Sequence, residues 1–345
     1  MLSEIRLSVI IPAYNPGKKI IPCLIELQKN LEYLSSQTIL FYEILIINDG
    51  GDEIDLNFIK NDEKIRLLKL RRNKGVGYAR QLGLKISKYD YLFYLDSDVV
   101  MENKNTLKIL FEDFLSNQDF GSIGPVMSYI NLNKAYSSNF VAAKTCYGYD
   151  QEDLLIEFSG MRSECGLMEK KFLKSVGGWS FIPGAGGEEF ILGHRITKNG
   201  KKNIITKNTN YTTFYDNLYI RCKTIISRTS AYLPILRNRK KFESRGAFAT
   251  LNQSLSTLTT SLLILVIILS NFINGLSILA KILFVSNLLI ELNFLRFCMK
   301  HYKKLDLPIY IIGIFAVNIS IVIGVLLGIY KLCFSSKKTR NKNYI

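Results

Sequence analysis

The sequence predicts an α/β protein in which a mostly parallel sheet lies between helices, followed by a hydrophobic C-terminal region. Three observations lead to this fold class. Continuous apolar runs alternate with helical patterns between Leu7 and Leu95, as in parallel sheets that are covered on both faces. Polar side chains follow directly after these runs. Charged residues are frequent up to Arg245 and absent from Gly246 through Ala280, a gap too long for a core helix of a soluble domain.

Apolar periodicity defines the N-terminal elements. Buried strands are predicted where a continuous apolar run ends in turn residues, and helices where apolar residues recur at helical spacing. The predicted strands are Leu7–Pro12, Tyr42–Asn48, Ile65–Leu70 and Tyr91–Leu95, and the predicted helices are Lys18–Ser35 and Lys74–Ser87. A mixed pattern of short strands, glycines and aromatic residues from Phe120 to Tyr215 predicts that the sheet is extended there.

Polar side chains gather where the predicted strands end. Tyr14 and Asn15 follow the first strand, Asp49 follows the second, and Asp96 and Asp98 follow the fourth. In parallel α/β sheets, ligands bind in a crevice beyond the carboxyl ends of the strands. These residues therefore predict one ligand-binding crevice at that edge of the sheet.

The sharpest chemical signal is Asp96-Ser97-Asp98, in which two carboxylates flank one small residue at the end of a buried strand. Hard oxygen ligands suit Mg²⁺ or Mn²⁺, and such an ion can bridge a diphosphate and neutralise its charge. An isolated Asp-x-Asp is usually a solvated loop. The strand context and the polar ends of the preceding strands favour the metal site.

A second acidic signal is Glu188-Glu189, directly after the glycine-rich stretch Gly184–Gly187. A flexible loop that presents a carboxylate to a site is suited to a general base. An acidic helix N-terminus stabilised by the helix dipole is the alternative, because Phe190–Lys198 has a helical pattern. The two interpretations are compatible.

The chain is strongly basic, with a formal net charge of +16. An AT-rich genome is one explanation, and attraction to polyanions is another. Much of the excess lies in Arg221–Arg245, beside the apolar region, so an anionic lipid surface is favoured over nucleic acid. We interpret this segment as an amphipathic helix at the membrane interface, with an ordinary solvated basic helix as the alternative.

The C-terminal region contains candidate membrane spans. Leu255–Ile273 and Leu307–Tyr330 are long enough to cross a hydrocarbon core of about 30 Å, and Leu276–Phe297 is a weaker third candidate that contains three charges. Two spans and three spans each leave one basic cluster on the wrong side of the positive-inside rule, and three are favoured. The predicted domains are 1–220, the globular domain; 221–250, the interfacial segment; 251–335, the membrane region; and 336–345, a basic tail.

These motifs, in this order, resemble the inverting family 2 glycosyltransferases with a GT-A fold, of the membrane-anchored bacterial type. The resemblance runs from Ser8 to about Tyr215. It rests on VIIPAYN (Val9–Asn15), EILIINDGGDE (Glu43–Glu53), NKGVGYARQLGL (Asn73–Leu84), YLFYLDSDV (Tyr91–Val99), and VGGW followed by GEEFILGHRITKNG (Gly187–Gly200).

The resemblance implies a role for each matching residue. The donor, a nucleotide-diphosphate sugar, is expected to contact Pro12, Tyr14, Asn15, Asp49, Lys74, Gly75, Arg80, Asp96 and Ser97, with Asp49 at the nucleobase. Asp96 and Asp98 are expected to hold Mn²⁺ or Mg²⁺. Glu189, in place of the family's usual aspartate, is expected to be the catalytic base, and Trp179, Glu188 and Arg195 to contact the acceptor. For Trp179, the only tryptophan, core packing is the open alternative.

The implied function is sugar transfer to a saccharide or lipid-linked saccharide in polysaccharide biosynthesis of the cell envelope. The implied location is the inner (cytoplasmic) membrane, which the chain crosses more than once, with the catalytic domain in the cytosol. A polyprenyl-phosphate glycosyltransferase is the nearest alternative. A processive synthase is disfavoured, because those relatives carry a Gln-x-x-Arg-Trp motif and Trp179, the only tryptophan, does not follow an arginine. A catalytically inactive membrane scaffold is disfavoured, because Asp98 and Glu189 are both present.

Overall fold

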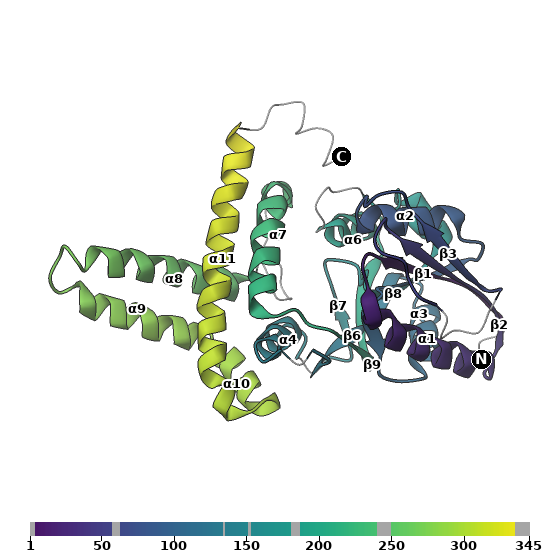
Figure 1. Ribbon diagram of the computed structural model, residues 1–345, viewed down its shortest axis with the longest axis horizontal. Helices are drawn as coiled ribbons and strands as arrows, with labels where there is room; N and C mark the ends of the chain where they lie inside the picture. Colours follow the sequence, from purple (N-terminus) through teal and green to yellow (C-terminus); the bar gives the residue numbers. More distant parts are fainter. Residues whose placement is uncertain are drawn as a thin grey trace. The chain divides into compact units, whose positions relative to one another are not determined.

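The computed structural model describes residues 4–56, 63–133, 135–150, 153–180, 187–239 and 250–334 (Figure 1). The chain forms two compact units. The first contains residues 1–128 and 152–214, and the second contains residues 129–151 and 215–345. The second unit therefore includes a short segment that the sequence placed inside the globular domain, and it begins a few residues before the predicted boundary at 220.

The first unit is built on a nine-stranded sheet with the order β3-β2-β1-β4-β8-β6-β9-β5, and β7 pairs with β9. Four strands form a parallel part of this sheet: β1 (Glu4–Ala13), β2 (Ile39–Asn48), β3 (Ile65–Lys69) and β4 (Tyr91–Leu95). All four predicted strands are present, and the first two are longer than predicted. The pairing in register of Ala13 with Asn48 brings the carboxyl ends of β1 and β2 together.

Antiparallel strands extend this parallel part. They are β5 (Val99–Met101), β6 (Phe120–Asn131), β7 (Leu155–Glu157), β8 (Cys165–Glu169) and β9 (Lys202–Thr213). Strand β8 runs antiparallel beside β4, so that Cys165 pairs with Leu95 just before the Asp-Ser-Asp motif. The fold class predicted from the sequence is confirmed, with an antiparallel extension over the region that had a mixed pattern.

Helices cover both faces of the sheet. One hydrophobic cluster joins alternate residues of β1 to α1 (Ile20–Ser35) and α3 (Thr106–Leu115). The other joins the opposite face to α2 (Val76–Ile86), α5 (Lys170–Ser175) and α6 (Glu188–Lys198). A short 3-10 helix, Gly17–Lys19, precedes α1. Burial on both faces explains why β1 and β2 are continuous apolar runs.

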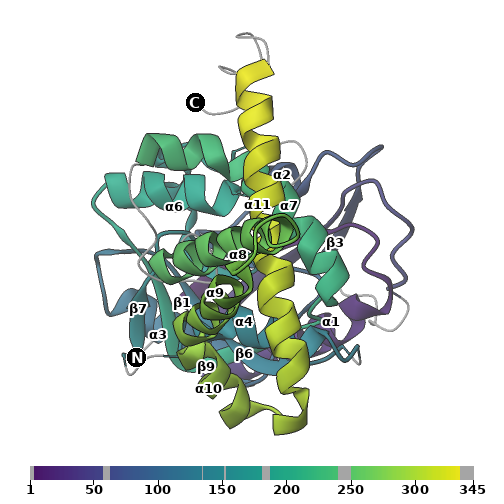
Figure 2. The same ribbon diagram turned by 90° about the vertical axis from the view of Figure 1, so that its left-hand side faces the viewer.

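The second unit is helical. Its elements are α4 (Ser138–Tyr147), α7 (Leu218–Arg239), α8 (Leu251–Leu269), α9 (Leu276–Ile290), α10 (Leu292–His301), the 3-10 helix Lys304–Asp306, and α11 (Leu307–Phe334). Helices α8 and α9 form a hairpin, which points toward the viewer in Figure 2 and is crossed by α11. Helix α7 packs along α11, where an added Cβ at Gly324 would lie 2.7 Å from Thr229.

Within the described ranges, two helical segments are long and apolar enough to cross a membrane, Leu251–Leu269 and Lys304–Lys331. The third candidate, Leu276–Phe297, is not one continuous helix as the sequence predicted. It breaks at Glu291 into α9 and α10, which are bent by 56° and give a third span only if taken together. The Glu291 carboxylate is buried and forms an ion pair of 2.9 Å with Lys144 of α4. This ion pair ties the break between α9 and α10 to α4.

The basic segment Arg221–Arg245 is only partly described. Its first part belongs to α7, and the serine at position 230 accepts a hydrogen bond of 3.1 Å from Lys331 of α11. Residues 240–249, and the basic tail 336–345, lie outside the described part of the chain. The interfacial role of this segment stays a prediction.

Candidate active site

A cavity of about 630 Å³ lies in the first unit, beyond the carboxyl ends of β1, β2 and β4. Its lining includes nine of the residues predicted for the donor and the metal: Pro12, Tyr14, Asn15, Asp49, Lys74, Gly75, Asp96, Ser97 and Asp98. The parallel register explains this convergence, because neighbouring parallel strands end at the same edge of the sheet. The crevice expected from the strand ends is therefore present.

The turns after β1 and β2 are locked to each other. Asn15 has a left-handed backbone, with φ of 46°, and its side-chain Oδ1 accepts a hydrogen bond of 2.7 Å from the Asp52 N–H. Asn48 donates to the Asp52 carbonyl at 2.7 Å and accepts from the Gly51 N–H at 3.0 Å. An amide can donate and accept at once. This dual bonding explains why asparagine suits position 48.

Asp49 fixes the start of α2. Its Oδ1 accepts from the Lys74 N–H and its Oδ2 from the Gly75 N–H, both at 2.8 Å. Gly75, the residue before α2, has φ of 92°, which glycine adopts without strain. The carboxylate is buried, and both of its oxygens accept hydrogen bonds from backbone N–H groups. The predicted contact of Asp49 with a nucleobase would therefore use the lone pairs that these two bonds leave over.

Asp96 and Asp98 line the cavity. Asp96 accepts a hydrogen bond of 2.8 Å from Nη2 of Arg80, and its own N–H donates to the carbonyl of Glu164, the residue directly before β8. The pKa of Asp96 is raised to about 6, chiefly by burial and also by the nearby Asp98 carboxylate, against the opposing effect of Arg80. A divalent cation would relieve the repulsion between these carboxylates.

The donor set fits a divalent cation that shares its shell with substrate. Among the residues that the structure describes, no three His, Cys, Asp or Glu side chains converge to form a cage. Mg²⁺ is commonly held by one or two carboxylates, with phosphate oxygens and waters completing its shell, and Mn²⁺ accepts similar oxygen ligands. Two carboxylates that line one cavity match that arrangement.

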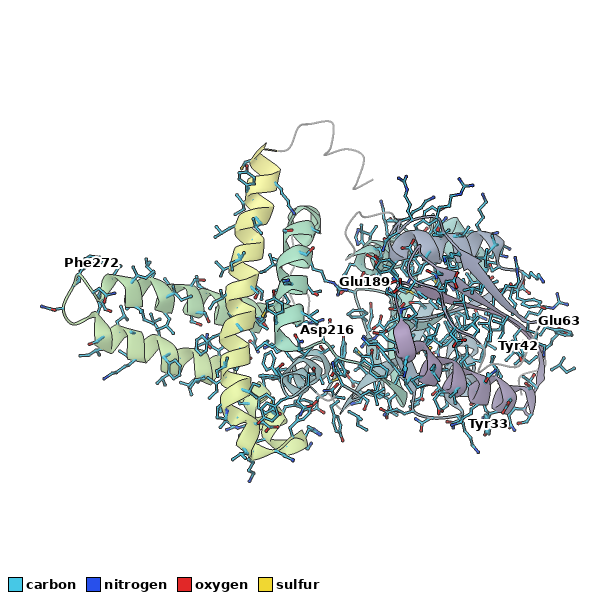
Figure 3. The ribbon with its side chains drawn as sticks, in the orientation of Figure 1. Tyr33, Tyr42, Glu63, Glu189, Asp216 and Phe272 are labelled. Carbon is cyan, nitrogen blue, oxygen red and sulfur yellow. The ribbon has the colours of Figure 1, made fainter. Side chains whose placement is uncertain are left out.

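Glu188 and Glu189 begin α6, after Gly187 in a left-handed conformation with φ of 102°. The Glu188 side chain is buried, and its Oε1 accepts from Nη1 of Arg80 at 3.3 Å. Glu189, labelled in Figure 3, is half-buried, and its Oε2 accepts from the Gly187 N–H at 3.1 Å. The glycine-rich stretch before Gly187 lies outside the described residues. The helix and its acidic N-terminus are present as predicted.

Trp179 is a core residue, which corrects the prediction that it stacks on an acceptor. The indole is 4% exposed and packs edge-to-face on Tyr94, with ring centroids 5.1 Å apart. The Arg80 guanidinium lies 5.0 Å from its ring centroid. The alternative of core packing, which the sequence left open, is what the structure has.

Arg195 supports the turn between Val176 and Ser180, which includes Trp179, and does not line the cavity. Its guanidinium donates to the carbonyls of Val176 and Gly178, at 3.1 and 3.2 Å, and also to the Ser180 hydroxyl. Burial lowers its pKa. Arg80 likewise does not line the cavity, although the sequence placed it near the donor.

Sequence reasoning missed two features of the site. Lys19 lines the cavity from the 3-10 helix after the first turn, and its ammonium lies 5.7 Å from the Phe214 ring centroid. Glu164 lies beside the metal motif, and its carboxylate accepts from the Tyr211 hydroxyl at 2.7 Å and from Arg162 at 2.8 Å. Lys19 follows the Pro16-Gly17 turn after one intervening residue, Lys18, so its place near the turn was a usable signal. The sequence around Glu164 contains no such signal, because only the pairing of β4 with β8 brings this residue to Asp96.

A mixed α/β sheet whose parallel strands end at an Asp-Ser-Asp cavity is the fold of the GT-A nucleotide-sugar transferases. Residues 8–176 match the family model described as Glycosyl transferase family 2. The chain therefore carries a domain of glycosyltransferase family 2.

Individual relatives agree with this family. The chain is 27% identical over 160 residues to "Glycosyltransferase GlyG" of Streptococcus pneumoniae, covering 45% of this chain and 49% of that protein. It is 32% identical over 132 residues to a "Dolichyl-phosphate beta-glucosyltransferase" of Dictyostelium discoideum, covering 36% of this chain and 40% of that protein. In these matches the chain spans about half or less of the relatives' length.

A solved structure with the same fold is the "Mannosyltransferase PcManGT from Pyrobaculum calidifontis in complex with GDP-Man and Mn2+". The two chains are 12% identical, with a TM-score of 0.56 over 95% of this chain and 88% of that one. At this identity the likeness concerns the fold alone.

Proposed function

We propose that this protein is an inverting, metal-dependent glycosyltransferase that uses a nucleotide-diphosphate sugar. The observation that carries the proposal is the cavity, in which Asp96 and Asp98 line the same space as the turns after β1 and β2. A family 2 domain over residues 8–176 and relatives named as glycosyltransferases support the reaction class.

The donor end of the cavity is suited to a nucleoside diphosphate. Asp96 and Asp98 would hold Mn²⁺ or Mg²⁺, which when bound would stabilise the charge on the departing diphosphate. Lys19 and Lys74 also line the cavity and add positive charge near that position. The exposed ring of Tyr14 offers an apolar face to the nucleobase.

Glu189 is the proposed base. The acceptor oxygen forms a bond to the anomeric carbon while the bond from that carbon to the phosphate oxygen breaks. The acceptor proton passes to the Glu189 carboxylate, and the electron pair leaves with the nucleoside diphosphate. Arg80 joins the two halves of this site, because it bonds both to Asp96 and to Glu188, the residue next to the base.

The acceptor is proposed to be a saccharide or a lipid-linked saccharide at the cytosolic face of the inner membrane, in polysaccharide biosynthesis of the cell envelope. The two long apolar helices are consistent with membrane association. A polyprenyl phosphate is the second candidate acceptor, because one relative is named as a dolichyl-phosphate glucosyltransferase. The basic segment that begins in α7 is proposed to lie on anionic lipid headgroups.

A donor screen tests the proposal. The full-length protein in detergent is heated with each common nucleotide-diphosphate sugar, with and without Mn²⁺, and the unfolding temperature is measured. A bound donor raises that temperature by mass action, so a metal-dependent shift would identify the base and the sugar together. If no donor shifts the protein under either condition, the enzymatic proposal fails and a membrane scaffold becomes the better account.

A further inference from the structure

We infer that Glu188 is a positioning residue that acts on the metal motif through Arg80. By sharing the Arg80 guanidinium with Asp96, Glu188 leaves the Asp96 carboxylate available to a divalent cation. The inference rests on the proposed function, because it takes Asp96 as a metal ligand. It replaces the predicted roles of Arg80 in donor contact and of Glu188 in acceptor contact.

The geometry of Arg80 supports a bridge. The Arg80 side chain is 3% exposed and that of Glu188 is 5% exposed, so their ion pair is shielded from bulk water. Asp96, which lines the cavity, is 28% exposed. Nη2 bonds to Asp96 at 2.8 Å, and Nη1 bonds to Glu188 at 3.3 Å. The two carboxylates thus occupy different nitrogens of one planar group. Guanidinium presents its donors in such a fixed fork, which the single ammonium of lysine does not reproduce.

The bridge is held in place by close packing. An added Cβ at Gly77 of α2 would lie 2.5 Å from the Ser180 carbonyl, so α2 touches the turn before α6 backbone to backbone. Gln81, one residue after Arg80, accepts from the Trp179 N–H at 2.8 Å. Trp179 in turn covers the Arg80 guanidinium. Arg80 therefore has little freedom to follow one carboxylate when the other changes.

Charge determines the direction of the effect. With both carboxylates ionised, one guanidinium charge is divided between Asp96 and Glu188. If Glu188 loses its charge, the full attraction of Arg80 falls on Asp96, which then binds a competing cation less well. Outer groups that orient metal ligands commonly change metal affinity by about 10–100-fold. We expect the lower end of this range, because Asp98 is untouched.

The test is Glu188→Gln, which keeps an oxygen acceptor for Nη1 and removes the charge. Binding of Mn²⁺ to the full-length protein in detergent is measured by calorimetry, with and without UDP. Glu188→Gln is expected to raise the Mn²⁺ dissociation constant about tenfold. A change of less than twofold would overturn the inference.

A second comparison separates the bridge from a simple field effect, because removing any nearby negative charge weakens cation binding. Glu188→Gln is therefore repeated in the Arg80→Lys and Arg80→Gln backgrounds, with thermal unfolding to show that each variant is folded. The inference predicts that Glu188→Gln then changes the dissociation constant by less than twofold. An undiminished tenfold effect without the arginine would refute it. If the wild-type protein binds no Mn²⁺ at all, the proposed metal-dependent function is refuted as well.

Discussion

The Asp49 carboxylate accepts a hydrogen bond of 2.8 Å from the Gly75 N–H, twenty-six positions away in the sequence. This bond ties the end of β2 to the start of α2. The same carboxylate holds the Lys74 N–H through its other oxygen. Both partners line the cavity. The wall of that cavity is therefore set by a buried charge bonded to backbone, which is a stronger constraint than a bond between neutral groups.

Asp49→Asn tests this constraint. The amide keeps one acceptor but turns an NH₂ group toward a backbone N–H, so one bond is lost and two donors face each other. We expect the free energy of unfolding to fall by about 1–3 kcal/mol and nucleoside diphosphate binding to weaken. Chemical denaturation and calorimetry measure the two effects. The exposed Asp52→Asn is the matched control, and equal losses in both variants would contradict the argument.

Asp98→Ala should remove a ligand of the divalent cation. Mn²⁺-dependent binding of UDP is expected to disappear, and sugar transfer to fall by about 100-fold or more, because charge on the leaving diphosphate is no longer stabilised. The unfolding temperature without metal should change little. Asp90→Ala serves as control, because Asp90 is an exposed carboxylate directly before β4 and away from the metal motif that follows this strand. Unchanged Mn²⁺ dependence in Asp98→Ala would exclude this residue as a ligand.

Glu189→Gln separates the base from the binding site. The amide oxygen can still accept from the Gly187 N–H, so α6 should begin as before. Transfer is expected to fall by about 10²–10⁴-fold, because the acceptor proton has no base, while donor affinity is kept. Single-turnover kinetics and calorimetry measure these quantities. Glu157→Gln, an exposed glutamate on β7, is the control; a Glu189→Gln enzyme with full turnover would assign the base elsewhere.

Gly83→Ala tests the contact between α2 and the sheet. The new Cβ would lie 2.4 Å from Cγ2 of Ile10, a fully buried and branched residue of β1. Alanine gains about 1 kcal/mol of helix propensity over glycine, but overpacking costs about 1–3 kcal/mol. Ile10 belongs to β1, which pairs with β2 on one side and β4 on the other, so it has little room to move. We therefore expect the cost of overpacking to exceed the gain in helix propensity, and the free energy of unfolding to decrease. Lys85→Ala, at an exposed position on the same helix, should leave stability nearly unchanged. A Gly83→Ala variant that is more stable than the wild type would show that β1 can move to accommodate the new Cβ.

Asn318→Leu tests the polar contact between α8 and α11. The buried Asn318 amide accepts from Gln253 at 2.7 Å and donates to the Thr260 hydroxyl at 2.8 Å. Hydrogen bonds between helices in apolar surroundings are worth about 1–2 kcal/mol, and the substitution leaves Gln253 without this acceptor. Unfolding in detergent should require less denaturant. Ile319→Leu, on an exposed position, is the control, and equal midpoints for both would refute the contact.

The sequence alone determined strands β1 to β4 and helices α1 and α2 of the first unit, because burial on both faces demands continuous apolar runs and helix amphipathicity repeats at fixed spacing. It also determined the cavity, because parallel strands must end at one edge. Asp49, Asp96 and Asp98 were found in this way, from residues that directly follow a strand.

Only the tertiary structure decided which distant side chains meet. Arg80 and Glu188 lie 108 positions apart, and nothing local to either one reveals that a single guanidinium serves both Glu188 and Asp96. The burial of Trp179 and the helix break at Glu291 have the same origin, since each depends on a partner from another element. Periodicity reports which face of an element is buried, whereas packing alone selects the group that covers it.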